Sequence, residues 1–138
     1  MPVGSPTPEI VAAAGALAIE SILAARRKLD EVSPYIDRPA EWITARLKEF
    51  VWSKQREIAE SIAVNRRTAV PSAHEMGKSW LASRIVAWWL DVHAPGEAFV
   101  VTTAPTAPQV RAILWREINR AHRKGNLLGR TNQTEWWI

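Results

Sequence analysis

The stretch that decides the fold is Thr68-Ala69-Val70-Pro71-Ser72-Ala73-His74-Glu75-Met76-Gly77-Lys78-Ser79. Its first four residues form a short, bounded segment, as expected of a strand that feeds a loop. We predict a loop from Ser72 to Gly77 and a helix from Lys78 to Asp91. Because this helix is apolar on nearly all sides, we expect it to be packed between two layers.

A second strand and a further helix are predicted downstream. Ala98 to Thr103 is a continuous run rich in β-branched residues, typical of a strand buried on both faces of a parallel sheet. Thr106-Ala107-Pro108-Gln109 has the spacing of a capping box and predicts a helix to about Lys124. Thr134 to Ile138 resembles the first half of another strand. This order predicts a βαβα unit with a right-handed crossover onto a parallel sheet.

The residues before Thr68 predict three helices. Thr7-Pro8-Glu9 starts the first one with a capping hydroxyl, a proline in the first turn and an acid at the positive end of the helix dipole. A second pattern begins at Pro39 and a third covers about Lys54 to Val64. We therefore expect an α/β fold with an incomplete parallel sheet at residues 39–138, preceded by a helical amino-terminal extension at residues 1–38.

Composition limits the classes of protein that fit. The 138 residues suffice for one domain with a core but are few for a complete motor ATPase. The absence of cysteine excludes disulfides and thiolate metal sites and favours a reducing compartment. The apolar stretch from Ile10 to Ile19 is shorter than the ~20 residues of a membrane span. A secretory signal peptide begins with basic residues, whereas the first charged residue here is the acidic Glu9. We expect a cytoplasmic protein without a membrane partner.

The segment from Ser72 to Ser79 matches the Walker A pattern G-x-x-x-x-G-K-[ST] of P-loop NTPases, with serine in place of the first glycine. In this motif, backbone N–H groups and the positive end of the following helix bind phosphate oxygens. Lys78 would reach the β- and γ-phosphates and stabilise transition-state charge, and Ser79 would bind Mg²⁺. Gly77 permits the tight turn. The predicted cofactors are ATP and Mg²⁺, and the predicted phosphate-binding residues are Ser72, Ala73, His74, Glu75, Met76, Gly77, Lys78 and Ser79.

Some positions in this loop leave alternatives open. Glu75 places a carboxylate in a phosphate-binding loop, so its side chain must point away from the ligand. His74 either faces the nucleotide or caps the loop. The alternative for the whole motif is an exposed turn with a Gly-Lys pair, and the predicted strand before it and helix after it argue against that alternative.

Gln55 is a candidate contact to the base of the nucleotide. A glutamine amide can accept a hydrogen bond from adenine N6–H and donate one to N7. Such a contact would make the site prefer ATP to GTP. The alternative is a glutamine on a solvated helix face.

Two further groups have weaker functional interpretations. The residues from Thr102 to Thr106 follow the predicted second strand, at the edge of a parallel sheet that faces ligands, and they would contact nucleic acid or relay the nucleotide state. A helix cap explains Thr106 equally well. The basic row on the last predicted helix would track a phosphate backbone, or it forms a solvated outer face. This row comprises Arg116, Arg120, Arg123 and Lys124.

With these elements in order, the sequence from about Trp42 onward resembles the ATPase domain of bacteriophage terminase large subunits. The resemblance is carried by Trp52-Ser53-Lys54-Gln55, the phosphate loop, Thr103-Ala104-Pro105-Thr106 with Gln109-Val110, and Leu114-Trp115-Arg116-Glu117-Ile118. It implies an ATP-driven translocase that packages double-stranded DNA, with a separate carboxyl-terminal nuclease. It also implies a homo-oligomer that works with a portal and a small terminase subunit in the host cytoplasm.

The same resemblance assigns the adenine contact to Gln55 and the phosphate loop to residues 72–79. Many terminases have an arginine in this loop as a charge stabiliser, and His74 stands at the corresponding position. The acidic strand end that holds Mg²⁺ and activates water has no counterpart, because the pair Asp30-Glu31 precedes the loop. We therefore expect a truncated piece of an ATP hydrolase that does not itself turn over ATP. The alternatives are a fragment of a helicase with a Gln motif and Walker A, or a non-enzymatic remnant with a vestigial nucleotide site.

Overall fold

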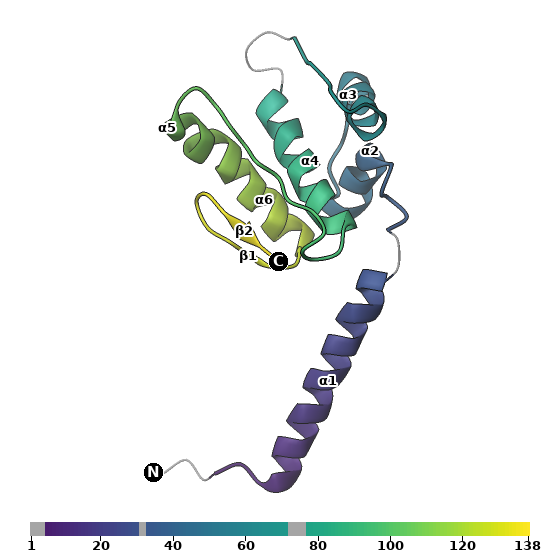
Figure 1. Cartoon of the computed structure of the whole chain (residues 1–138), viewed down its shortest axis with the longest axis vertical. Helices are drawn as coiled ribbons and strands as arrows, with labels where there is room; N and C mark the ends of the chain where they lie inside the picture. Colours follow the sequence, from purple (N-terminus) through teal and green to yellow (C-terminus); the bar gives the residue numbers. More distant parts are fainter. Residues whose placement is uncertain (1–4, 31–32, 72–76) are drawn as a thin grey trace. The chain divides into compact units, whose positions relative to one another are not determined.

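The computed structural model describes residues 5–30, 33–71 and 77–138. The chain divides into two compact units, Met1–Glu31 and Val32–Ile138. Figure 1 shows the helices and strands of both units. Each unit is described by itself below.

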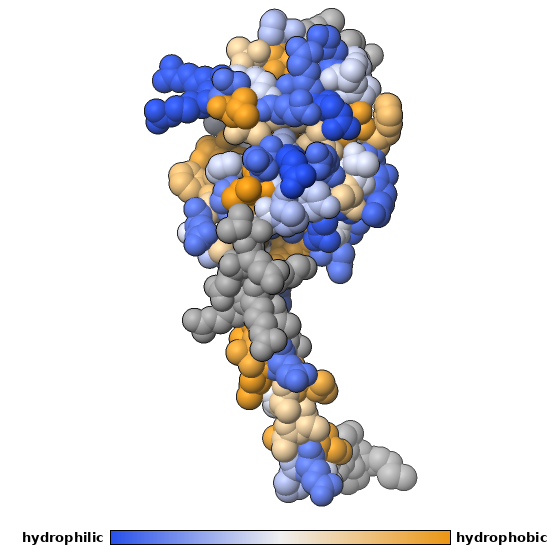
Figure 2. Space-filling model, turned by 90° about the vertical axis from the view of Figure 1, so that its right-hand side faces the viewer, coloured by the Kyte–Doolittle hydropathy of each residue, from blue (hydrophilic) through white to orange (hydrophobic). Residues whose placement is uncertain are grey.

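The first unit is built around a single helix, α1 (Pro8–Asp30). It begins as its sequence predicts, with Glu9 in the first turn and the carbonyl of Thr7 accepting a hydrogen bond from the N–H of Val11 at 3.1 Å. Apolar side chains such as Ile10 and Leu17 are exposed along the helix. Figure 2 shows orange, apolar areas on the surface of this unit. Neither α1 nor any other helix within the described residues has the length and apolarity needed to cross a membrane.

The second unit is mainly helical. Its helical elements are α2 (Pro39–Trp42), the π-helical segment η1 (Ile43–Leu47), α3 (Ser53–Val64), α4 (Lys78–Val92), α5 (Ala107–Gln109), the π-helical segment η2 (Val110–Trp115) and α6 (Arg116–Gly125). The strands β1 (Arg130–Thr131) and β2 (Trp136–Trp137) form an antiparallel pair, with Arg130 opposite Trp137 and Thr131 opposite Trp136.

Helix α4 is the centre of this unit. Figure 1 shows α2 and α3 on one side of it and α6 on the other, so the prediction of a helix packed between layers is confirmed. Two buried tryptophans fix its carboxyl-terminal half. The indole N–H of Trp88 donates to the carbonyl of Tyr35 at 2.7 Å, and that of Trp42 donates to the Asp91 carboxylate at 2.8 Å. Buried indole N–H groups need such acceptors, so these bonds also orient the two rings.

The predicted parallel sheet is wrong. Among the described residues, the strands are β1 and β2, which pair antiparallel. Residues 68–71 and 98–103, predicted to be strands, have no regular secondary structure. Phe99 is 83% exposed and Val101 is 73% exposed, so this run is not buried on two faces. A β-branched run favours extended backbone, but a strand also requires a neighbouring backbone to pair its N–H and C=O groups, and no described segment pairs with this run.

Candidate functional site

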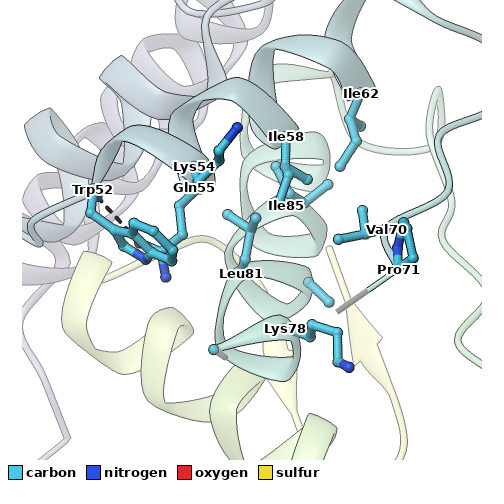
Figure 3. Close-up of a pocket in the computed structure, with 12 residues that line it drawn as sticks. Trp52, Lys54, Gln55, Ile58, Ile62, Val70, Pro71, Lys78, Leu81 and Ile85 are labelled. Carbon is cyan, nitrogen blue, oxygen red and sulfur yellow. Dashed lines mark hydrogen bonds between the residues drawn. The ribbon is translucent and has the colours of Figure 1, made fainter. Parts of the chain in front are cut away.

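A cavity of about 520 Å³ opens between α3 and α4 (Figure 3). Most of its lining is apolar and comes from both helices and from the extended segment that follows α3. These apolar lining residues are Ile58, Ile62, Val70, Pro71, Leu81, Ala82 and Ile85. The remaining lining residues are Trp52, Lys54 and Gln55 on the α3 side and Gly77 and Lys78 on the α4 side.

The α4 side of the cavity is the amino-terminal end of a 15-residue helix. Gly77 precedes the helix with φ 74° and ψ 17°, a left-handed conformation that glycine adopts without strain. Its carbonyl accepts the N–H of Leu81 at 2.9 Å. The N–H groups of the first helical turn have no partner within the helix, so this end carries partial positive charge. Lys78, on the first turn of α4, adds a full charge (Figure 3).

The α3 side of the cavity contains Gln55. Its side chain is 8% exposed, which excludes the alternative of a solvated helix face. Its Oε1 accepts a hydrogen bond from the backbone N–H of Trp52 at 3.4 Å, drawn in Figure 3, and this bond caps the start of α3. Its Nε2 lies 3.1 Å from the position that a Cβ atom would occupy on Gly77. The structure therefore brings together Gln55 and the Gly77-Lys78 turn.

Trp52 lines the same cavity at the start of α3, and its side chain is 38% exposed. Sequence analysis placed this residue in a motif but gave it no role. An aromatic ring next to a polar amide, in an otherwise apolar cavity, suits a flat heteroaromatic ligand.

The remaining residues of the predicted phosphate loop are only partly described. Ser72, Ala73, His74, Glu75 and Met76 lie outside the described residues, so their roles stay predictions. Ser79 is exposed on the first turn of α4. It is not among the residues that line the cavity. Within the described part of the chain, no group of three or more His, Asp or Glu side chains is arranged to hold a metal ion.

The two weaker candidate groups lie away from this cavity. Thr102 lines a second cavity of about 400 Å³ together with Trp115 and Trp136. Thr106 precedes α5 in an extended conformation and makes no side-chain capping bond. In the basic row, Arg120 pairs with Glu117 at 2.9 Å and Lys124 pairs with Glu49 at 3.0 Å. Half of this row is therefore engaged in ion pairs of the fold.

A buried ion cluster next to the cavity was missed by the sequence analysis. Its central residue is Arg84 on α4, whose side chain is 1% exposed. Its Nε and Nη2 donate to the two carboxylate oxygens of Glu49 at 2.8 and 2.9 Å, and its Nη1 donates to Glu117 at 2.9 Å. The Arg84 cluster, defined as Glu49, Arg84 and Glu117, thus joins the segment before α3 to α4 and α6. A charged residue inside an apolar helix was the available signal, because a buried charge needs a partner.

The cluster shifts the ionisation of its members. Burial by itself raises the pKa of Glu49, but the hydrogen bonds and positive charges of Arg84 and Lys124 outweigh burial, so the pKa of Glu49 is lowered. Burial likewise opposes the charge of Arg84, yet Glu49 and Glu117 raise the pKa of Arg84 above its ordinary value. Both groups are therefore held in their charged forms. The guanidinium also lies 4.8 Å from the ring centre of Trp80.

Comparison of the chain with protein-family models, with curated proteins and with solved structures gives no match.

Proposed function

We propose that this chain is the ATP-binding part of a DNA-packaging motor of the terminase large-subunit kind, with ATP held between α3 and the first turn of α4. The observation that carries the proposal is that Gln55 and the Gly77-Lys78 turn line one cavity. These residues were assigned to the two ends of one nucleotide from sequence alone, and they come from different helices. A Gly-Lys-Ser turn that matched the motif by chance would not be expected to lie beside a buried glutamine.

The chemistry of the cavity supports a nucleotide in a definite orientation. The apolar lining and Trp52 suit the base, and the Gln55 amide offers the hydrogen bonds that distinguish adenine from guanine. The positive end of α4 and the Lys78 ammonium suit the phosphates. The volume of about 520 Å³ lies within the range of about 300–1,000 Å³ that is usual for small-molecule sites.

Magnesium would accompany the phosphates. Ser79 is exposed on the first turn of α4, directly after Lys78, where its hydroxyl can join a shell made mainly of phosphate and water oxygens. There the ion would offset phosphate charge. No carboxylate is found among the described residues that line the cavity. We therefore assign nucleotide binding to this chain, and hydrolysis would need an acid from outside this cavity.

The remaining parts of the proposal rest on the sequence resemblance. These are the translocation of double-stranded DNA, assembly into a homo-oligomer, and work with a portal and a small terminase subunit. The resemblance is specific in the Thr103-Ala104-Pro105-Thr106 element followed by Gln109.

The test is a titration of the full chain with ATP and Mg²⁺, followed by tryptophan fluorescence and by melting temperature. We expect a saturable fluorescence change and a higher melting temperature, because a ligand that binds the folded state stabilises it. Since the chain has eight tryptophans, Trp52→Phe serves as the control and should lose most of the fluorescence change. If ATP changes neither the fluorescence nor the melting temperature, the alternative of a non-enzymatic remnant is favoured instead.

A further inference from the structure

We infer that Glu49 and Arg84 are positioning residues, which hold the Gln55 side of the cavity at a set distance from the α4 side and thereby govern the choice between ATP and GTP. The inference rests on the proposed function. Neither residue lines the cavity, so each would act through the backbone that carries Trp52 and Gln55.

The connection runs through the short segment between η1 and α3. Lys48 ends η1 in a left-handed conformation with φ 54°, and residues 48–52 have no regular secondary structure. Glu49 lies in this segment, and its carboxylate is bound at both oxygens by the Arg84 guanidinium. A two-point contact of this kind fixes orientation as well as distance. The segment then reaches Trp52, whose N–H is bound by Gln55.

The other end of the connection is on α4. Arg84 lies in the same helix as Lys78, about 9 Å further along the axis by the helical rise. A helix of this length is a rigid element, so an anchor at Arg84 also fixes the turn at Gly77. The ion pair between Glu49 and Arg84 thus connects the α3 side of the cavity to the α4 side, although neither residue lines the cavity. Between these two walls, Gln55 Nε2 lies 3.1 Å from the position that a Cβ atom would occupy on Gly77.

The rest of the Arg84 cluster makes the anchor stiff. Arg84 also donates to the Ser83 hydroxyl at 2.9 Å and to Glu117 on α6. Its guanidinium is therefore held from several sides and cannot follow Glu49 if that segment moves. Meanwhile Val51 and Ala59 are buried in the apolar core, so α3 keeps its packing when the ion pair is weakened. Loss of Glu49 is expected to loosen the start of α3 rather than to unfold the unit.

The test compares Glu49→Gln with Glu57→Gln in the full chain. Glu57 is on α3 itself and forms an ion pair with Lys54, but these side chains are 68% and 66% exposed. Two quantities are measured: the ratio of ATP affinity to GTP affinity, and the hydrogen exchange of the backbone amides of residues 52–58 without nucleotide. For Glu49→Gln we expect the affinity ratio to fall and the exchange to rise, each by about three- to tenfold. For Glu57→Gln we expect neither to change.

A second variant, Arg84→Lys, keeps the positive charge but loses the two-point contact. It should raise exchange in residues 52–58 and lower the affinity ratio as Glu49→Gln does, although the charge is retained. If both variants remain folded with wild-type exchange in this segment, the positioning role is overturned, whether or not the chain binds ATP. If exchange rises but the ATP-to-GTP ratio stays at the wild-type value, the role in nucleotide choice is overturned while nucleotide binding stands. If the wild-type chain binds neither ATP nor GTP, the proposed function is overturned, and the role of Glu49 and Arg84 in nucleotide choice is overturned with it.

Discussion

The Nε2 atom of Gln55 lies 3.1 Å from the place where a Cβ atom would stand on Gly77, and Gly77 has φ 74°. An alanine at position 77 would therefore meet two separate obstacles, one in the backbone and one from the neighbouring amide. Both residues line the cavity between α3 and α4. Four predictions follow from it and from the Arg84 cluster.

The first concerns Gly77→Ala, with Gly96→Ala as the matched control. Gly96 also has a positive φ, 84°, but a Cβ atom there would meet nothing within 4 Å. Both variants should lose about 1–2 kcal/mol of unfolding free energy, measured in urea, because both strain the backbone. Gly77→Ala alone should also lower ATP affinity and the preference for ATP over GTP. An equal effect of the two variants on nucleotide binding would argue against the contact with Gln55.

The second concerns Lys78→Ala. Removing the ammonium removes a charged hydrogen-bond donor to the phosphates, so ATP affinity should fall by about ten- to hundredfold. The control is Arg56→Ala, because Arg56 is an exposed cation on α3 that does not line the cavity. Isothermal titration of each variant with ATP measures the effect. Equal affinities of wild type and Lys78→Ala would remove the phosphate site from this turn.

The third separates two roles of Gln55, the adenine contact and the cap of α3. Gln55→Ala loses both, whereas Gln55→Glu keeps an oxygen for the N–H of Trp52 and loses the amide donor. Both variants should reduce the preference for ATP over GTP by about tenfold, whereas only Gln55→Ala loses the cap of α3. Competition between the two nucleotides gives the ratio. A ratio that survives in both variants would confine Gln55 to its capping role.

The fourth concerns acid. The pKa of Glu49 is lower in the folded chain than its ordinary value of 4.5, so this carboxylate stabilises the folded state above that value. Its contribution is lost as the pH falls from 4.5 through the lowered pKa, where protonation breaks the bonds to Arg84. Glu49→Gln should therefore be less stable than wild type at neutral pH, and the difference should shrink as the pH falls below 4.5. Melting temperatures recorded across this range would contradict the assignment if the two curves stayed parallel.

The helices were predicted close to their observed bounds. Capping residues and the spacing of apolar side chains are local signals, and they placed α1, α3 and α4 within a few residues of their ends. The predicted strands at residues 68–71 and 98–103 are wrong because pairing is not local, whereas the strand predicted from Thr134 to Ile138 contains β2. Residues 98–103 have the composition of a strand, but composition does not determine whether another segment of backbone lies beside them to pair with.

The candidate site shows the same division. Gln55 and the Gly77-Lys78 turn were singled out by residue type and motif, within a predicted parallel-sheet fold. They meet instead through the packing of α3 against α4. The Arg84 cluster was only partly readable: a charged residue inside an apolar helix signals a partner, but nothing in the sequence singles out Glu49 and Glu117 as that partner. Only packing shows that Arg84 is buried.

The Arg84 cluster also limits how this sequence can diverge over evolutionary time. A neutral residue at position 49 or 117 alone would leave a buried guanidinium short of negative charge, and a neutral residue at 84 would deprive two mostly buried carboxylates of their shared partner. Replacement of all three by apolar side chains of matching volume removes that conflict at once. Related sequences that descend from this chain are therefore expected either to keep all three residues of the Arg84 cluster or to replace all three together.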